Sequence, residues 1–294
     1  MSRCSSAITG SYINVQFPEN RLRAMVKRGA VPIGFQCHTG NADVIEISGI
    51  AGFDFVMLDT EHSTLNARAL DDLIRISERA HLTPLVRVPD RHAATDMRRA
   101  LEAGAQGLLI PQVRSAADIR YVLDVAMFPP QGQRGMCPAT RAAHFSLRSW
   151  DDYAAWNNSE ILLIPIIEHP EAVENVDAIC ASDSIHMIAF GAGDLSCAMG
   201  LGTQMMAHES IRAAYRRVLE AAKRHHVAVI GGPFLDPTAT ACRKALEEGA
   251  SVLFLGLDLF VFRQFCERAV RELHDAVKET PFSRPEPAPS GFLS

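Results

Sequence analysis

The stretch FVMLDTEHS, residues 55–63, passes directly from apolar residues to two carboxylates and an imidazole. Four consecutive apolar residues without alternation are typical of a parallel strand that is buried on both faces. Asp59, Glu61 and His62 follow with no glycine or proline between, so they are expected at the carboxyl end of this strand. In barrels of parallel strands, catalytic side chains stand at that end. The stretch therefore predicts both a parallel α/β fold and the place of a functional site.

An apolar run, a polar turn and an amphipathic segment follow one another repeatedly along the chain. Segments with helical periodicity, such as residues 67–81, separate the apolar runs, which are residues 31–38, 55–59, 83–89, 107–112, 161–168, 187–194, 227–233 and 252–258. Eight alternations over about 250 residues predict a (β/α)8, or TIM, barrel, here in residues 30–278. A doubly wound sheet is the main alternative, but no apolar run opens into GxGxxG.

Three segments fall outside the repeat. Residues 1–29 are expected to form an N-terminal segment with a leading helix. Residues 128–160 make an overlong connection after the fourth unit, and their two Trp and two Phe residues predict an ordered, lid-like loop. Residues 279–294 carry four prolines and are expected to be disordered.

Composition and charge exclude several classes of function. The formal net charge is −5 and no basic stripe is present, which argues against nucleic acid or an anionic membrane surface as partner. No segment resembles a signal peptide, and no apolar run approaches the roughly 20 residues of a membrane span. The seven cysteines are widely spaced without a CxxC pair, which favours reduced thiols. We therefore expect a cytoplasmic protein that acts on small molecules.

Polar side chains stand at the ends of six of the eight expected strands. Each has a possible structural role: Asp59 could cap the next helix, and Arg87 could pair with a buried carboxylate. His38, alone at the end of the first strand, is expected to be structural. Taken together, the convergence of the other groups on one rim favours a functional site, whose members are Asp59, Glu61, His62, Arg87, Gln112, Glu168 and Asp194.

Glu168 and Asp194 are the expected metal ligands, because they end adjacent strands and supply hard oxygen donors. Such a pair suits Mg²⁺ or Mn²⁺ and leaves positions for water or substrate. His169, directly after Glu168, could supply a nitrogen ligand, so zinc is an alternative metal. A Schiff base is not expected, since every lysine falls in an expected helix or its flank (Lys27, Lys223, Lys244 and Lys278). Carbonyl chemistry would instead use a metal as Lewis acid.

Six motifs in register resemble those of the HpcH/HpaI aldolases over roughly residues 18–275. They are FDFVMLDTEHS (53–63), LVRVP (85–89), EAGAQGLLIPQV (102–113), PPQGQRG (129–135), IIEHPEAVENVDAI (166–179) and GAGDLSCAMG (191–200). The resemblance implies a (β/α)8 barrel of the phosphoenolpyruvate/pyruvate type and a class II pyruvate aldolase that requires a divalent metal ion. It also implies a homo-oligomer, a hexamer built as a trimer of dimers, with the last helix exchanged between subunits.

Carried over position by position, the resemblance gives roles to the residues at the strand ends. Glu168 and Asp194 match ligands of a divalent ion, Mg²⁺, Mn²⁺ or Co²⁺. Arg87 matches the arginine that binds the pyruvate moiety and stabilises its enolate. His62 matches the catalytic base, and Asp59 the acid that orients it.

Three further residues complete the predicted site. Glu61 matches an acid near the water on the metal. The backbone amides around Gly193 and Asp194 are expected to hold the substrate carboxylate, and Gln112, at the end of the fourth strand, is also expected to bind substrate. The chain departs from the family pattern at Ile166, His169 and Cys137. These departures alter the walls that select the aldehyde.

The reaction implied is the reversible cleavage of a 4-hydroxy-2-oxo acid to pyruvate and an aldehyde, through a pyruvate enolate. One alternative keeps the barrel and the enolate but makes the protein a decarboxylase or another carbon–carbon lyase, acting on an oxaloacetate-like or CoA-thioester substrate. A second alternative is a non-catalytic barrel that binds a metabolite. A base beside a metal site favours an enzyme, because a binding module has no evident need of one.

Overall fold

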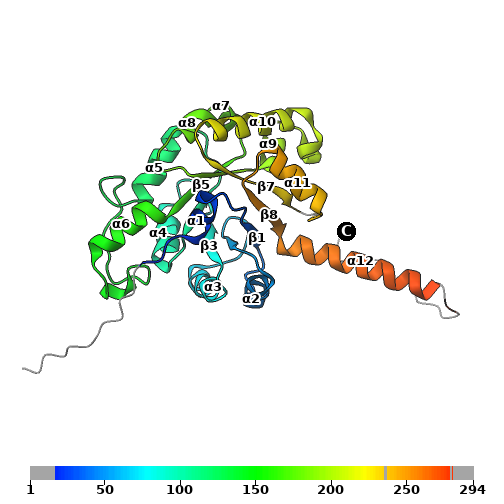
Figure 1. The fold of residues 1–294 in the computed structure, drawn as a ribbon, viewed down its shortest axis with the longest axis horizontal. Coiled ribbons are helices and arrows are strands. Elements are labelled where there is room, and N and C mark those ends of the chain that lie inside the picture. The colour runs from blue at the N-terminus through cyan, green and yellow to red at the C-terminus, as the bar shows by residue number, and fades with distance from the viewer. Residues whose placement is uncertain (1–16, 235–236, 279, 281–294) are drawn as a thin grey trace, which may run out of the picture.

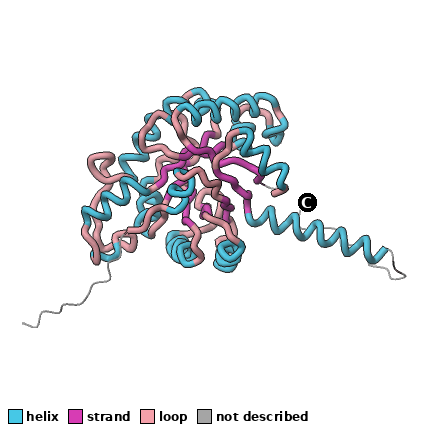
Figure 2. Tube along the Cα trace, in the orientation of Figure 1, coloured by secondary structure: helices cyan, strands magenta, loops and turns pink. Residues whose placement is uncertain are grey.

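The computed structural model describes residues 17–234, 237–278 and 280, and within them the predicted barrel is confirmed. The strands pair in parallel in chain order, and β1 also pairs with β8, so the sheet closes on itself. Helices surround this closed sheet (Figures 1 and 2). The strands are β1 (Ile33–Cys37), β2 (Phe55–Asp59), β3 (Thr83–Arg87), β4 (Gly107–Ile110), β5 (Leu162–Ile167), β6 (Met187–Phe190), β7 (Ala228–Phe234) and β8 (Val252–Leu257).

Helices connect successive strands. Those of the first half are α1 (Arg21–Lys27), α2 (Ala42–Ala51), α3 (Ala67–Arg79), α4 (Ala94–Ala103), α5 (Ala116–Ala126) and α6 (Trp150–Glu160), with the short 3₁₀ turn η1 (His144–Ser146). Those of the second half are α7 (Pro170–Glu174), α8 (Val176–Cys180), α9 (Ala192–Ala198), α10 (Glu209–Arg224), α11 (Ala239–Glu248) and α12 (Asp258–Lys278), with the 3₁₀ turn η2 (Gly202–Ala207). No helix in the described part of the chain is long and apolar enough to span a membrane.

Alternation along each strand divides the buried side chains into two sets. On β2, Phe55 and Met57 belong to the cluster that fills the barrel, whereas Val56 and Leu58 pack outward against the helices. Successive strand residues point to opposite sides of a sheet, so Asp59 shares the inward face of Phe55 and Met57. Burial on both faces explains the apolar runs without alternation that the sequence shows.

The amino-terminal end of the barrel is closed by α1. Leu22 is completely buried and joins the cluster inside the barrel. Asn20, also buried, fixes the start of this helix: its side-chain amide donates to the backbone oxygens of Gln106 (2.8 Å) and Glu160 (3.0 Å). The opposite end, where the strands finish, is left to the polar residues of the candidate site.

Residues 128–160 are folded but do not form the lid that the sequence suggested. Arg141 donates to the backbone oxygen of Ala103 (2.7 Å) and pairs with Glu78, and the amide of Ala142 donates to Glu102 (3.1 Å). These partners end α3 and α4, just before the next strands begin. The segment therefore packs at the amino-terminal end of its own barrel, because α5 runs antiparallel to β4 and delivers the chain there.

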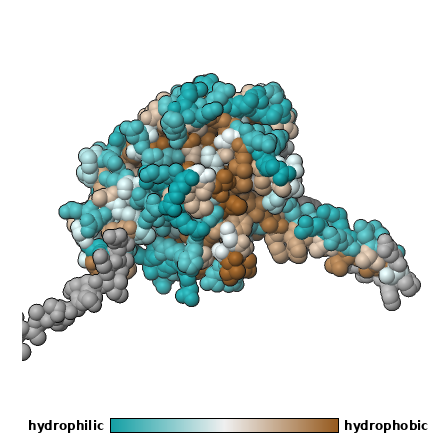
Figure 3. Space-filling view, viewed as in Figure 1, coloured by the Kyte–Doolittle hydropathy of each residue, from teal (hydrophilic) through white to brown (hydrophobic). Residues whose placement is uncertain are grey.

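Helix α12 leaves the barrel and projects away from it (Figure 1). None of its side chains is buried, and apolar patches lie along it (Figure 3). Its large exposed apolar residues are Leu259, Phe260, Val261, Phe262, Phe265, Val270 and Leu273. The proline-rich segment that the sequence predicts to be disordered lies outside the described residues, apart from Thr280.

The role of α1 as a plug can be tested by Leu22→Ala. Removing a completely buried leucine leaves a cavity inside the barrel, so the free energy of unfolding should fall by about 2–5 kcal/mol, measured by urea denaturation. Leu147→Ala serves as the matched control, since that side chain is 77% exposed and its loss should cost less than about 0.5 kcal/mol. Equal effects of the two substitutions would show that α1 does not carry this packing.

Candidate active site

Asp59 and Arg87 lie side by side at the ends of β2 and β3, where they are register partners. The guanidinium donates twice to the carboxylate, from Nε to Oδ1 at 2.9 Å and from Nη2 to Oδ2 at 2.6 Å. Nε of Arg87 also lies 3.3 Å from Oε2 of Glu61. Two parallel bonds fix the plane of the guanidinium as well as its charge. The guanidinium is therefore held in one orientation at the mouth of the barrel, which is the end at which the strands finish.

Asp59 receives more donors than Arg87 alone. Its Oδ2 accepts from Nε2 of Gln36 at 2.9 Å and contacts Nδ1 of His38 at 3.2 Å, while Oδ1 accepts from the amide of Glu61 at 3.0 Å. Burial by itself would raise the pKa of Asp59, but the hydrogen bonds and charge of Arg87 together with these amides lower it to about 2. The carboxylate is thus ionised at neutral pH.

His62 is placed differently from the prediction that Asp59 orients its ring. The imidazole is 58% exposed, and its Nε2 lies 3.7 Å from Oε2 of Glu61. Only the backbone amide of His62 reaches Asp59, at 3.4 Å from Oδ1. The prediction of an Asp59–His62 side-chain pair is therefore wrong for this structure, because Arg87, Gln36 and His38 already occupy the carboxylate.

Glu168 follows β5 and is buried at the same mouth. Its Oε1 accepts the backbone amide of Gln112 at 2.6 Å. Burial raises the pKa of Glu168 to about 7, and the negative charges of Asp194 and Glu61 add to the rise. Gly191 is required beside it, since a Cβ at that position would lie only 2.6 Å from Oε2. The site thus holds three carboxyl groups whose charges act on one another.

These carboxyl groups fit a hard divalent cation. Glu168 and Asp194 come from the ends of neighbouring strands, as predicted, and the pKa of Glu168 is raised first by burial and then by the negative charges of Asp194 and Glu61. Within the described residues no three His, Cys, Asp or Glu side chains gather as a complete metal site. Two carboxylate ligands would leave the remaining positions to water or substrate, which is the arrangement that Mg²⁺ and Mn²⁺ accept.

Gln112 contributes its backbone amide to the site, and Gly193 lies directly before Asp194. Gln112 has a positive φ of 56°, which turns its amide toward Glu168, and its carbonyl accepts Nη1 of Arg91 at 3.0 Å. Gly193 precedes Asp194 in α9, and a Cβ there would approach only Met205 Cε, at 3.8 Å. This open space leaves room for a ligand near the start of α9, whereas substrate binding by either residue stays a prediction.

Two site residues escaped the interpretation of the sequence. Gln36 was not singled out, and His38 was expected to be structural, yet both contact Asp59. Gly34, Gln36 and His38 are alternate residues of β1 and its end, and a Cβ on Gly34 would collide with the ring of Phe55 inside the barrel. This spacing of two was the available signal, since it places both side chains on the inward face beside Asp59.

The departures from the family pattern lie in different environments. Ile166 is buried among the side chains that fill the barrel. His169 caps α7, where its Nδ1 accepts the amide of Glu171 at 3.3 Å, so one ring nitrogen is already engaged. Cys137 is exposed in the segment at the amino-terminal end.

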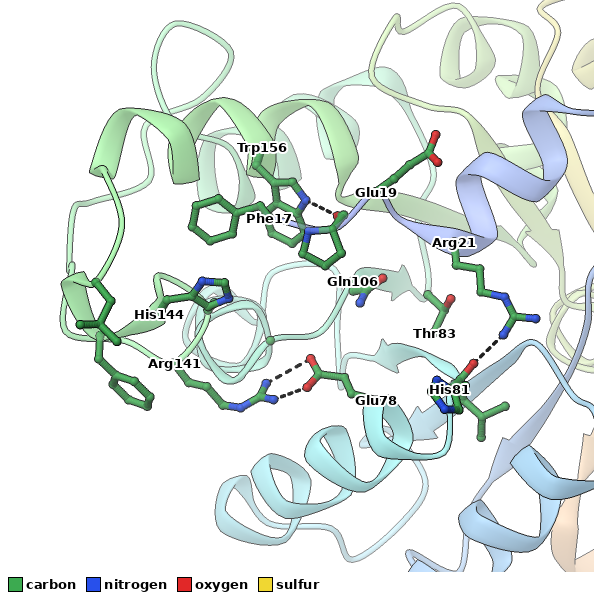
Figure 4. A pocket seen from close by; sticks show the side chains of 16 residues that line it. Phe17, Glu19, Arg21, Glu78, His81, Thr83, Gln106, Arg141, His144 and Trp156 are labelled. Carbon is green, nitrogen blue, oxygen red and sulfur yellow. Dashed lines mark hydrogen bonds and ion pairs between the residues drawn. The ribbon is translucent and has the colours of Figure 1, made fainter. Parts of the chain in front are cut away.

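A hollow also lies at the opposite end of the barrel from the candidate site. It has a volume of about 950 Å³ and lies between the aromatic side chains of Phe17 and Trp156 and the Arg141–Glu78 ion pair (Figure 4). It also borders His144, whose ring stacks on Phe17 with centroids 4.6 Å apart. None of the strand-end carboxylates lines it, so this hollow is separate from the candidate site.

The raised pKa of Glu168 predicts how stability depends on pH in metal-free protein. The folded value of about 7 exceeds the ordinary 4.5, so stability that is present below pH 4.5 is lost as the pH rises to 7. Glu168→Gln removes this titration. Between pH 4.5 and 7, the difference in free energy of unfolding between the variant and the wild type should shift by about 2–4 kcal/mol in favour of the variant, measured by urea denaturation with chelator present. A difference independent of pH would contradict the assignment.

Comparisons with known proteins identify the family of this chain. The model of the HpcH/HpaI aldolase/citrate lyase family matches residues 33–264. A 5-keto-4-deoxy-D-glucarate aldolase of Klebsiella pneumoniae subsp. pneumoniae is 31% identical over 269 residues, which are 90% of this chain and 99% of that protein. A hydroxypyruvate/pyruvate aldolase of Sagittula stellata is 30% identical over 250 residues, 85% of this chain and 96% of that protein.

The fold is shared with solved structures as well. The crystal structure of an HpcH/HpaI aldolase from Desulfitobacterium hafniense superposes with a TM-score of 0.81 at 29% identity, covering 90% of this chain and 99% of that one. The family model covers most of the chain, and the relatives align over nearly their whole length. The chain therefore belongs to the HpcH/HpaI aldolase/citrate lyase family.

Proposed function

We propose that the protein is a metal-dependent class II pyruvate aldolase, which reversibly cleaves a 4-hydroxy-2-oxo acid to pyruvate and an aldehyde. The observation that carries this proposal is the mouth of the barrel, where a guanidinium held by Asp59 acts electrostatically on Glu168, a buried carboxyl with a raised pKa. Membership of the family makes the chain a carbon–carbon lyase. The fork and the carboxyl together supply what the enolate half of such a reaction needs.

Glu168 and Asp194 would hold the divalent ion, Mg²⁺, Mn²⁺ or Co²⁺. When bound, such an ion acts as a Lewis acid toward the 2-oxo group and the carboxylate of the substrate. Backbone amides near Gly193 would receive the substrate carboxylate at the start of α9. Ionised Glu168 is needed for this role, and a cation beside it favours the ionised form.

Arg87 would stabilise the charge that develops on the enolate oxygen. A preorganised donor contributes most when it does not have to reorient during the reaction, and Asp59 holds Arg87 by two bonds. Asp59 is therefore a positioning residue for the guanidinium. Glu61, 3.3 Å from Nε, completes the charge balance around it.

A base must remove the proton of the 4-hydroxyl group. His62 is the candidate from the sequence, and its exposed ring is accessible to a ligand that enters from solvent. Glu61, rather than Asp59, is the carboxylate beside that ring. Imidazole is suited to proton transfer near neutral pH.

Of the two products of the proposed cleavage, the aldehyde is less well defined than pyruvate. The relatives are named for 5-keto-4-deoxy-D-glucarate and for hydroxypyruvate and pyruvate, which share a 2-oxo acid portion. The same mouth would also serve a decarboxylase or another carbon–carbon lyase that forms a pyruvate enolate. A non-catalytic binding barrel is disfavoured by the fixed fork, which a simple binding site would not require.

We also propose a cytoplasmic homo-oligomer, a hexamer built as a trimer of dimers. Helix α12 carries large apolar side chains, such as Phe262 and Leu273, that are exposed in the part of the chain that the structure describes. Exposed apolar surface of this extent is typical of an interface between subunits. Exchange of α12 between paired subunits would bury it.

Arg87→Lys should preserve the fold and lose most of the activity. A lysine keeps the positive charge beside Asp59 but cannot reproduce a planar, bidentate fork. Retro-aldol cleavage measured by coupled pyruvate release should fall at least about 100-fold, because a preorganised oxyanion donor is lost. Circular dichroism and the unfolding midpoint are the controls. A variant that only unfolds would favour a purely structural role for Arg87.

The reaction type is tested by comparing His62→Ala with Glu168→Gln in two assays. Cleavage of a 4-hydroxy-2-oxo acid needs a base for the hydroxyl proton, whereas decarboxylation of oxaloacetate forms the same enolate without one. His62→Ala should therefore lower cleavage by roughly 10²–10⁴-fold and leave decarboxylation largely intact. Glu168→Gln should abolish both activities, because both need the metal ion.

The outcomes of this comparison separate the candidate functions. Equal loss of both activities in His62→Ala would mean that His62 maintains the site instead of acting as base. Decarboxylation without any cleavage by the wild type, tested with a panel of aldehydes in the direction of condensation, would favour the decarboxylase. Full activity of Glu168→Gln in chelator would exclude the proposed metal site.

A further inference from the structure

His38 follows β1 on the face that lines the barrel. Gly34, Gln36 and His38 alternate along this strand end, and the inward direction of Gly34 is fixed by its closeness to Phe55. Nδ1 of His38 lies 3.2 Å from Oδ2 of Asp59, and 22% of the His38 side chain is exposed. The imidazole therefore contacts the buried carboxylate while part of its side chain is exposed.

The state of Asp59 decides which nitrogen of His38 carries hydrogen. The carboxylate is ionised, since its pKa is lowered to about 2, and an ionised carboxylate only accepts hydrogen bonds. Nδ1 must therefore be the donor, which leaves Nε2 available for proton transfer. The His38 amide donates to Oδ1 of Asp258 at 3.1 Å, so the backbone is held as well. A carboxylate that fixes the tautomer of a histidine is a recurring catalytic arrangement.

A shared acceptor atom places His38 next to Arg87. Oδ2 of Asp59 accepts Nη2 of Arg87 at 2.6 Å, Nε2 of Gln36 at 2.9 Å and Nδ1 of His38 at 3.2 Å. Donors that share one oxygen are neighbours, so the imidazole lies close to the guanidinium of Arg87. The ring of His62 has no contact with Asp59 and pairs with Glu61 instead.

We propose that His38 is a second catalytic histidine, which carries a proton between water and the enolate carbon. This inference rests on the proposed function. In the cleavage direction the Nε2–H bond of the imidazolium breaks, and the electron pair of the enolate C=C bond forms the new C–H bond of the pyruvate methyl group. The enolate oxygen becomes the carbonyl oxygen, and the neutral imidazole takes up a proton from water. Condensation runs the same steps in reverse.

The test is exchange of the pyruvate methyl protons in D₂O, which needs no aldehyde and is followed by proton NMR. His38→Asn keeps a side-chain N–H close to the position of Nδ1, and so keeps a donor for Asp59, but has no second nitrogen. It should slow metal-dependent exchange by roughly 10²–10⁴-fold. His186→Asn is the matched control, because this exposed histidine precedes β6 at the other end of the barrel, and it should exchange at the wild-type rate.

Two further measurements separate catalysis from positioning. Binding of Mn²⁺ and of pyruvate to His38→Asn, measured calorimetrically, should stay within about threefold of the wild type, since a positioned base alters the rate and not the binding. Added imidazole should restore part of the exchange in His38→Ala.

Several results would overturn the proposal. Exchange by His38→Asn at the wild-type rate would show that the hydrogen bond to Asp59 is sufficient. Parallel loss of exchange and of ligand binding would show that His38 only maintains the site. If the wild type cleaves its substrate and His38→Asn exchanges the methyl protons at the wild-type rate, only the role of His38 is contradicted. The absence of any metal-dependent exchange in the wild type would contradict the proposed function as well.

Discussion

A full negative charge on Asp59, in a place that water does not reach, sets the arrangement of the whole mouth of the barrel. Burying an unpaired carboxylate is very costly, so the chain surrounds this one with Arg87, Gln36, His38 and backbone amides. Even a well-paired buried ion pair seldom adds stability over an apolar replacement of similar volume. Its presence at the end of two otherwise apolar strands is therefore better explained by what Arg87 does for a ligand than by what it does for folding.

The pKa values of the two buried carboxyl groups of the site, Asp59 and Glu168, are shifted in opposite directions. Asp59 has a guanidinium fork and a low pKa of about 2, whereas Glu168 has a single backbone donor, acidic neighbours and a pKa of about 7. Groups whose environments separate their pKa values in this way usually take different roles. Asp59 is a fixed anion that orients cationic and imidazole donors. Glu168 is an acid whose ionised form is opposed by burial and by like charges, and this difference supports the proposal that Glu168 binds the metal ion.

The sequence was sufficient for the barrel because its strands are buried on both faces. Continuous apolar runs such as residues 55–58 followed by charged residues specify both the strand and the end at which the site forms. The family resemblance then gave the roles, and the barrel itself is confirmed. Exchange of the last helix and the ligand roles of Glu168 and Asp194 stay predictions.

What the sequence did not reveal depends on relations between strands and on the path of the chain. The contact of His38 with Asp59 requires the register of β1 against β2, in which Cys37 is the partner of Leu58, and no local pattern encodes that pairing. The position of residues 128–160 depends on where α5 ends. The aromatic content of this segment indicated that it is folded, but it could not indicate that the segment packs at the amino-terminal end of the barrel. The predicted side-chain pair of Asp59 and His62 was wrong for a similar reason, since competition among donors for the oxygens of Asp59 is visible only in three dimensions.

The two ends of the barrel carry different physical tasks. At the amino-terminal end, α1 inserts Leu22 among apolar side chains and Asn20 satisfies two carbonyl groups, which are interactions that lower the free energy of the fold. At the carboxyl end, Glu168 is held where burial and like charges oppose its ionisation, which raises the free energy of the metal-free protein at neutral pH. A bound cation would relieve that opposition, so the same burial that destabilises the free site would strengthen its attraction for a metal ion. Gly191 is part of this arrangement, because any larger residue would displace the carboxyl group that creates it.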